Sequence, residues 1–330
     1  MTDSKCVLVY AECTDDGLTG TATELLGSGR QLADGLNQPL CCLLPRDASG
    51  TTATDAIARG ADRVYVLEPA VDDPEDVSGH LEGALAAVDE SRPSVMLIGH
   101  TALGRQLGPR LGFRLGSGVA TDCIDVRLDE SGNIVLTKPV YGGNALADFT
   151  ATTEPQIATV RPKAMSPLDP DLSREGDVVA LTRTAGTTPI KVIEKVREEV
   201  AGVKLEDAPV VVSGGRGTGG PEPFDTVLKE LADVLHGAVG ASRPPCDTGW
   251  APETMHIGLT GKIVAPDIYI AVAISGASQH MAGCSGAKTI IAINKDPEAN
   301  IFREAQYGVV GRYQDVLPAF TSKLQELLAE

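Results

Sequence analysis

The side chain in this sequence that most suggests chemistry is Arg216. It lies in the glycine-rich stretch 213–217, at the end of a strand predicted for Pro209–Ser213. The flanking glycines leave its guanidinium unshielded, and a planar cation held in this way suits an anionic or electron-rich planar partner. The stretch is neither a G-x-G-x-x-G fingerprint nor a P-loop. Taken alone, such a loop is more often a structural turn than a ligand site.

Four further polar loops follow between residues 239 and 297, and they contain most of the other candidate side chains. These candidates are Ser242, Arg243, Thr260, Ser275, Gly276, Ala277, Ser278, Gln279, His280 and Asn294. In parallel α/β domains the carboxyl ends of strands converge on one crevice, so we expect the five loops to form one ligand site. A helix predicted to begin after Ser275-Gly276-Ala277 would offer free amides to a phosphate. For His280, a capping or core role is an alternative.

The elements that would position these loops alternate between strands and helices. In the first half, short apolar runs predict strands at Cys6–Ala11, Pro39–Leu44, Arg63–Leu67 and Ser94–Gly99, with helices at 21–36, 52–59 and 76–89 between them. This order predicts an α/β fold with a mainly parallel sheet flanked by helices. The runs 133–140, 146–152 and 156–160 lack intervening helices and predict an antiparallel edge.

The second half repeats the α/β pattern after an exposed connector predicted for 161–177. Strands are predicted at 209–213, 269–274, 289–294 and 307–310, and helices at 224–235 and 315–330. We therefore expect two domains, each a mainly parallel sheet flanked by helices, at 1–204 and 205–330. The second would be a Rossmann-like ligand-binding domain. The segment 190–200 receives no assignment, and a hinge is expected within 190–209.

Composition narrows the function classes. The 330 residues carry a formal net charge of −17, and acidic residues outnumber basic ones on both sides of residue 204. Nucleic-acid binding and attachment to an anionic membrane are therefore disfavoured. No apolar stretch approaches the roughly 20 residues of a membrane span. Seven scattered cysteines without a CxxC motif, and a strand directly after the N-terminus, indicate a cytoplasmic protein with reduced thiols.

Residues 209–330 resemble the flavin-binding half of electron transfer flavoprotein alpha subunits. The resemblance is carried by SGGRG (213–217), GASRPPCDTGW (240–250), TGKIVAPDIYIAVAISGASQH (260–280) and AINKDPEANIF (292–302). The first half is similar through LVYAE (8–12), GHTALGRQLGPRLG (99–112) and YGGNALA (141–147). The resemblance thus spans nearly the whole chain and is most specific in its second half.

The resemblance implies one FAD, held mainly by the second domain, in a heterodimer with a beta subunit contacted by the first domain. All the candidates named above carry over as FAD contacts. Arg216 and Arg243 would offset negative charge on the reduced flavin, Thr260 would reach its N5 edge and His280 its O2 region. The run 275–279 would serve the pyrophosphate and ribityl chain, and Asn294 the adenosine portion.

The resemblance also implies an electron carrier rather than an enzyme with its own substrate. Electrons would come from an acyl-CoA dehydrogenase-type flavoprotein, as in fatty acid beta-oxidation, and pass to a membrane quinone oxidoreductase or another acceptor. One alternative is a subunit of an NADH-oxidising complex with an acyl-CoA dehydrogenase or reductase, able to bifurcate electrons through a second flavin. Another is a generic nucleotide-binding protein or NAD-linked dehydrogenase.

Three positions depart from the family pattern. Leu259 stands where many members have glutamine, and Arg312 where an acidic residue is common near the adenosine. The expected contacts of Arg312 and Tyr313 are therefore not carried over. Cys246 replaces a small aliphatic residue and is interpreted as a packing substitute rather than a redox thiol.

Overall fold

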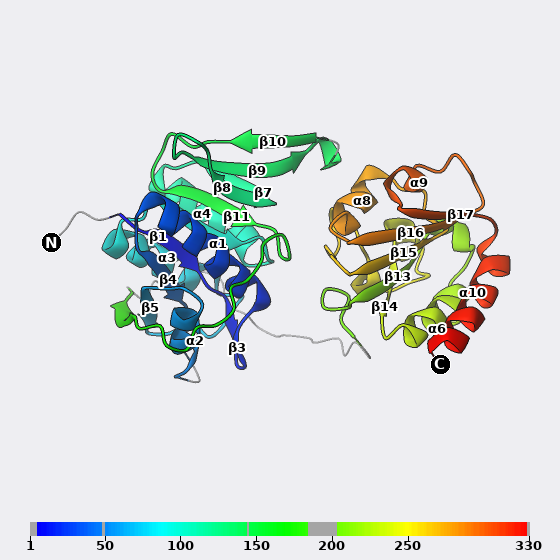
Figure 1. Cartoon of the computed structure of the whole chain (residues 1–330), viewed down its shortest axis with the longest axis horizontal. Helices are drawn as coiled ribbons and strands as arrows, with labels where there is room; N and C mark the ends of the chain where they lie inside the picture. The colour runs from blue at the N-terminus through cyan, green and yellow to red at the C-terminus, as the bar shows by residue number, and fades with distance from the viewer. Residues whose placement is uncertain (1–4, 48–49, 144, 184–202, 329–330) are drawn as a thin grey trace. The chain divides into compact units, whose positions relative to one another are not determined.

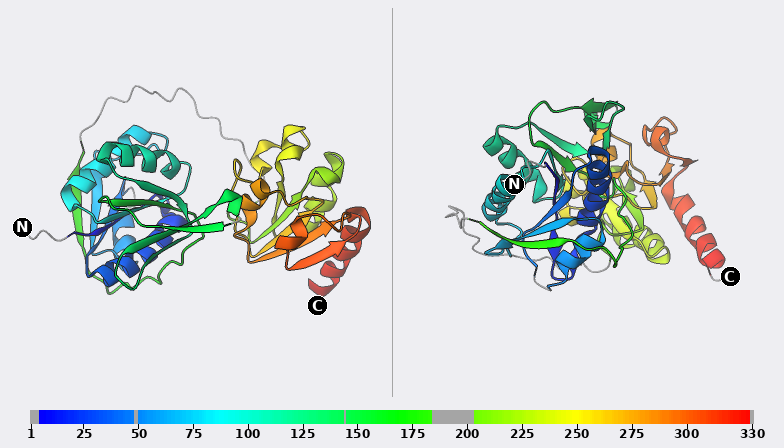
Figure 2. Two further views of the ribbon diagram at one scale, coloured as in Figure 1. Left: turned by 90° about the horizontal axis from the view of Figure 1, so that it is seen from above. Right: turned by 60° about the vertical axis from the view of Figure 1, so that its left-hand side comes forward.

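The computed structural model describes residues 5–47, 50–143, 145–183 and 203–328, which form two compact units (Figures 1 and 2). Residues 5–140 and 145–183 belong to the first unit, and residues 141–143 and 203–328 belong to the second. The unassigned segment 190–200 and most of the predicted hinge lie outside the described residues. The domain boundary at 204 therefore stays a prediction. Among the described residues, no helix is long and apolar enough to cross a membrane.

The first unit contains a seven-stranded parallel sheet in the order β12-β5-β4-β1-β6-β11-β7. Its strands are β1 (Val7–Tyr10), β4 (Leu40–Leu44), β5 (Arg63–Glu68), β6 (Val95–Gly99), β7 (Val119–Cys123), β11 (Gln156–Val160) and β12 (Asp177–Thr182). Its helices are α1 (Gly20–Leu36), α2 (Thr52–Ala58), α3 (Val77–Ser91) and α4 (Gly104–Leu115). Strands β2 (Cys13–Thr14) and β3 (Gly17–Leu18) form a small hairpin. The predicted parallel α/β architecture is confirmed.

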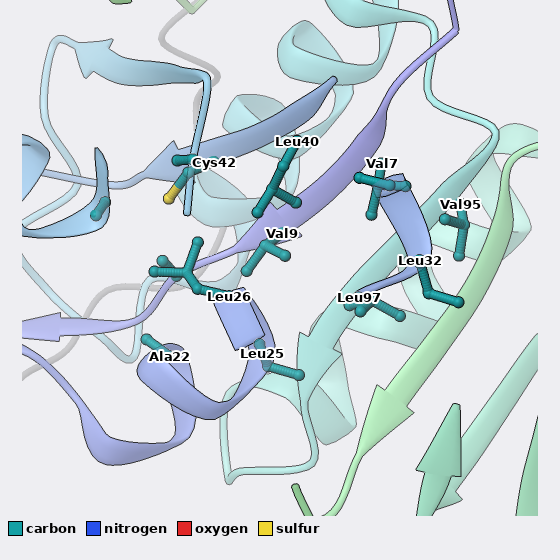
Figure 3. Packing of buried hydrophobic residues seen from close by; sticks show 14 of the residues in the cluster. Val7, Val9, Ala22, Leu25, Leu26, Leu32, Leu40, Cys42, Val95 and Leu97 are labelled. Atoms are coloured by element: carbon teal, nitrogen blue, oxygen red, sulfur yellow. The ribbon is translucent and has the colours of Figure 1, made fainter. Parts of the chain in front are cut away.

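Both faces of this sheet are buried, which explains its continuous apolar strands. Val7 and Val9 of β1 lie on one face in a single buried cluster with Leu25, Leu26 and Leu32 of α1, and Figure 3 shows Val9 beside Leu26 and Val7 nearer Leu32. Leu8 and its alternate neighbours pack on the opposite face, beneath α3 and α4. Since successive side chains of a strand point to opposite faces, a strand buried on both sides has no polar alternation.

The antiparallel edge predicted for the runs 133–140, 146–152 and 156–160 is correct only in part. Strand β9 (Ile134–Val140) does pair antiparallel with β10 (Ala145–Phe149) and β8 (Asp125–Leu128), in a separate three-stranded sheet. Strand β11, however, lies inside the main sheet, parallel to β6 and β7. The reason is burial: four of its five residues are buried, as suits an interior strand.

The second unit contains a five-stranded parallel sheet in the order β14-β13-β15-β16-β17. Its strands are β13 (Val210–Gly214), β14 (Ala238–Ala241), β15 (Ile268–Val272), β16 (Thr289–Asn294) and β17 (Tyr307–Val310). Its helices are α5 (Glu222–Asp225), α6 (Val227–Val234), α7 (Arg243–Asp247), α8 (Ser278–Cys284), α9 (Ile301–Glu304) and α10 (Tyr313–Leu328). The predicted helix 224–235 is two helices, because Thr226 leaves the helical conformation at φ −117° and ψ −102°.

The strand order places a topological switch point between β13 and β15. From β13 the chain goes first to β14 on one side and then to β15 on the other. Loops leaving the carboxyl ends of such strands diverge and open a crevice between them, which is where ligands bind in this fold class. The loops after β13 and β15 carry Arg216 and the run 275–280.

Candidate functional site

The five polar loops of the second unit surround one cavity of about 800 Å³. Nine of the eleven candidate side chains line it: Arg216, Ser242, Arg243, Thr260, Ser275, Ala277, Gln279, His280 and Asn294. Gly276 and Ser278 do not line it. The volume falls within the roughly 300–1,000 Å³ of small-molecule and cofactor sites. The convergence of the loops expected from the parallel order is therefore present.

Arg216 begins a short 3-10 helix, η2 (Arg216–Thr218), directly after β13. A Cβ on Gly215 would lie 2.2 Å from the carbonyl oxygen of Ala273, so only glycine lets this turn approach the end of β15. Arg216 itself is exposed. Among the described residues, no carboxylate lies within ion-pair distance of its guanidinium. Its positive charge is therefore available to a ligand in the cavity.

The Arg216 turn is tied to the C-terminal helix by one buried hydrogen bond. The Tyr313 hydroxyl donates to the carbonyl oxygen of Thr218 at 2.7 Å, and both residues are less than a tenth exposed. Tyr313 therefore supports the cavity wall without lining the cavity itself.

Tyr313→Phe is expected to lower the free energy of unfolding by about 1–2 kcal/mol, because the buried Thr218 carbonyl loses its donor. Urea denaturation of the holoprotein measures this change. Tyr307→Phe is the matched control, since Tyr307 is 66% exposed on β17 and should change stability little. Equal effects of the two substitutions would show that the Tyr313 bond does not stabilise the turn.

Arg243 contributes a second, partly compensated cation at the start of α7. Its Nε lies 3.3 Å from Oδ2 of Asp247, and both side chains are more than half exposed. The preceding residue, Ser242, is buried and its amide donates to the Gly214 carbonyl. Arg216 and Arg243 therefore differ, because only Arg243 shares its charge with a carboxylate.

Thr260 lies in a tight turn that is hydrogen-bonded to α8. Gly258 adopts φ +154°, and the Leu259 amide donates to the carbonyl oxygen of Gln279 at 2.7 Å. The Thr260 side chain is exposed at the cavity. Leu259 is 54% exposed there as well, so an apolar side chain does occupy the position of the usual glutamine.

His280 lies in the cavity wall with both ring nitrogens already bonded. Its Nδ1 is 3.0 Å from the carbonyl oxygen of Ile257, and its Nε2 is 2.9 Å from the hydroxyl of Tyr269. Only 6% of His280 is exposed. The alternative of a core histidine therefore describes its side chain well, and a bond to the flavin O2 region would have to replace one of these contacts.

Asn294 joins the loops that follow β15 and β16. Its Nδ2 donates to the carbonyl oxygen of Ile274 at 2.9 Å, and its Oδ1 accepts from the Asp296 amide at 3.0 Å. The side-chain amide of Asn294 therefore holds these two loops of the cavity wall together.

The lining residues that were not among the sequence candidates include two basic side chains, His256 and Lys295, and two carboxylates, Asp296 and Glu298. His256 is 3% exposed, and its Nδ1 is 3.1 Å from Oε1 of Glu253. It lies two residues before Gly258, which begins the loop that contains Thr260, so it was outside the polar loops predicted from the sequence. Lys295 lies in the loop that follows β16, and its side chain is exposed. Its position directly after the end of a strand was the available signal.

Cys246 behaves as a packing residue. Burial, reinforced by the negative charges of Glu253 and Asp247, raises the pKa of its thiol to about 11. The thiol therefore stays protonated near neutral pH, where a redox-active cysteine would need the thiolate. Its Sγ also contacts the Pro252 carbonyl oxygen at 3.6 Å.

The lining combines charged, hydrogen-bonding and apolar groups, as cofactor sites do. Two arginines and a lysine supply positive charge, Asp296 and Glu298 supply two carboxylates, hydroxyl and amide groups supply hydrogen bonds, and close-packed glycine turns bring backbone to the wall. Among the described residues, no group of three or more His, Cys, Asp or Glu side chains could hold a metal ion.

Comparison with known proteins matches both halves of the chain. Residues 7–186 match the family model of the electron transfer flavoprotein domain, and residues 204–285 match that of the electron transfer flavoprotein FAD-binding domain. The electron transfer flavoprotein subunit alpha of Thermoanaerobacterium thermosaccharolyticum is 39% identical over 330 residues, covering 99% of this chain and 100% of that protein. The Bacillus subtilis subunit alpha is 37% identical over 98% of each chain. Protein FixB of Clostridium saccharobutylicum is 37% identical over 99% of this chain and 98% of its own.

Proposed function

The chain belongs to the electron transfer flavoprotein alpha-subunit family, and we propose that it carries electrons on one FAD held in the cavity of its second unit. The observation that carries this proposal is the meeting of five separate loops around one cavity with Arg216 and Arg243 in its wall. FAD, when bound, supplies the redox chemistry by taking up and releasing one or two electrons. The chain's own residues bind the cofactor, orient it and set its electrostatic surroundings.

The proposed roles are those implied by the family resemblance, and the charges and hydrogen-bonding groups in the wall support them. Arg216 and Arg243 offset negative charge on the reduced flavin, Arg216 more strongly because its charge is uncompensated. The exposed Thr260 hydroxyl serves the flavin N5 edge. Within the run 275–279, the lining residues Ser275, Ala277 and Gln279 serve the pyrophosphate and ribityl chain, and Asn294 holds its neighbouring loops in place for the adenosine end.

The partners belong to the same proposal. An alpha subunit implies a complex, and we propose a heterodimer with a beta subunit. An acyl-CoA dehydrogenase-type flavoprotein would donate electrons, and a membrane quinone oxidoreductase or another acceptor would receive them. A cytoplasmic location is proposed because all seven cysteines are free, as in a reducing compartment.

A second candidate function is a subunit of an NADH-oxidising complex that bifurcates electrons. The relative named Protein FixB matches this chain over the same length as relatives named subunit alpha. Membership of the family therefore does not decide between the electron-carrier function and the bifurcating complex. NADH and a second flavin would bind mainly on the partner subunit, which leaves this chain's cavity unchanged in either case.

Co-expression with the beta subunit tests both functions. The carrier function predicts one FAD per purified heterodimer and reduction of that FAD by an acyl-CoA dehydrogenase. The second function predicts two flavins and rapid NADH oxidation in stopped-flow mixing. A complex without FAD, or one that no acyl-CoA dehydrogenase reduces, would contradict the carrier function.

A further inference from the structure

The two bonds of the His280 ring define which nitrogen carries its proton. A carbonyl oxygen can only accept, so Nδ1–H donates to Ile257. In a neutral imidazole Nε2 is then the acceptor, and the Tyr269 hydroxyl donates to it at 2.9 Å. Tyr269 is fully buried on β15, so water does not compete for this bond. The ring is therefore satisfied on both sides by protein groups.

We propose that Tyr269 is a positioning residue that keeps His280 neutral with its proton on Nδ1, so that His280 offers the cofactor neither a positive charge nor an N–H donor. The tautomer is a property of this chain alone. Its consequence for FAD rests on the function proposed above.

The groups around the ring support the neutral form. Burial lowers the pKa of His280 to about 4, outweighing the Ile257 carbonyl that favours the charged ring, and a charge on His256 would lower it further. Burial also raises the pKa of Tyr269 well above its ordinary value, so its hydroxyl keeps its proton. Ser213 of β13 and Cys284 of α8 also lie beside the Tyr269 hydroxyl, and the Cys284 thiol donates to the His280 carbonyl oxygen.

Charged partners for the ring are lacking among the described residues. The nearby carboxylate, Glu253, pairs with His256 and not with His280. A histidine becomes a cation near neutral pH when an adjacent carboxylate stabilises its charged form. Without one, the positive charge of the wall comes from Arg216, Arg243 and Lys295.

The tautomer can be read directly by nitrogen NMR of the complex with the beta subunit, prepared with ¹⁵N-labelled histidine. The spectrum of a His280→Gln variant assigns the signals of His280. We expect the neutral Nδ1–H form, with no titration of these signals between about pH 5.5 and 8. An Nε2–H form, or a doubly protonated ring at neutral pH, would overturn the proposal.

Tyr269→Phe removes the donor to Nε2 while keeping the ring of Tyr269. A buried acceptor without a donor is unfavourable, so we expect signals of an Nε2-protonated ring to appear. A proton on Nε2 adds positive potential at the cavity, so the midpoint potential of bound FAD should shift upward. Unchanged His280 signals in this variant would also overturn the proposal.

The chain offers a matched control in its first unit. Tyr10 is fully buried, and its hydroxyl is 2.6 Å from Nδ1 of His80. Tyr10→Phe therefore breaks a buried tyrosine–histidine bond between residues that do not line the cavity. We expect it to leave the His280 signals and the FAD potential unchanged.

A double variant separates positioning from a general structural effect. In a His280→Leu background, Tyr269→Phe should no longer shift the FAD potential, because the group through which it acts is gone. A shift that persists there would overturn the proposal. If the complex holds no FAD, the function proposed above fails, while the NMR measurement still decides the tautomer.

Discussion

Arg216→Ala is expected to make the bound FAD harder to reduce, lowering its midpoint potential by about 50–100 mV per electron. The reason is the loss of an uncompensated positive charge from the wall of the cavity that would hold the flavin, which gains negative charge on reduction. For a separation of about 7 Å and an effective dielectric of about 20–40, one charge pair would be worth about 1–2 kcal/mol. A transfer of one charge through 100 mV corresponds to about 2.3 kcal/mol.

Spectroelectrochemical titration of the purified heterodimer measures this potential. Arg303→Ala is the matched control, because it removes the same charge from α9 of the second unit, at a residue that does not line the cavity. Arg243→Ala should have a smaller effect than Arg216→Ala, since Asp247 already compensates part of its charge. An unchanged potential in Arg216→Ala would refute the role given to that guanidinium.

Gly283→Ala is expected to weaken FAD binding roughly ten- to hundredfold. A Cβ at this position of α8 would lie 2.4 Å from the Gly258 nitrogen and 2.6 Å from its Cα. Both are backbone atoms, so the turn that carries Thr260 must move away from α8. Overpacking of this kind costs about 1–3 kcal/mol, which exceeds the gain of up to about 1 kcal/mol from a better helix former.

Equilibrium titration of the apoprotein complex with FAD measures the affinity. Gly220→Ala serves as the control, because a Cβ at Gly220 meets nothing within 4 Å and its backbone needs no positive φ. Native-like affinity in Gly283→Ala would mean that the turn tolerates displacement, and that α8 and the 258–262 loop are not a rigid part of the wall.

Much of the second unit could be predicted because most of its strands are short apolar runs followed directly by glycine or polar residues. The predicted ranges 289–294 and 307–310 coincide with β16 and β17. The convergence of the loops also followed from topology alone, since parallel strands bring their carboxyl ends to one edge. Most of the candidates that line the cavity could therefore be named before any contact was known, although Gly276 and Ser278 do not line it and His256 and Lys295 were missed.

Hydrogen-bond partners could not be predicted in the same way. The Tyr269–His280 and Tyr313–Thr218 bonds join residues 11 and 95 positions apart, and neither spacing has a sequence signature. The same limit explains β11. Its apolar run showed that a strand exists, but its neighbours are set by tertiary packing, and consecutive strands without helices suggested a hairpin instead.

The insertion of β11 between β6 and β7 has a consequence for synthesis on the ribosome. Strands β6 and β7 are complete by residue 123, yet the strand that joins them ends at residue 160, and the edge strand β12 ends at 182. The nascent first unit therefore cannot close its sheet until nearly all of it has left the exit tunnel. Every residue lining the cavity is translated after that, from 216 onward. Since nascent domains generally fold as units from the N-terminus, the scaffold should be complete before the cofactor has anywhere to bind.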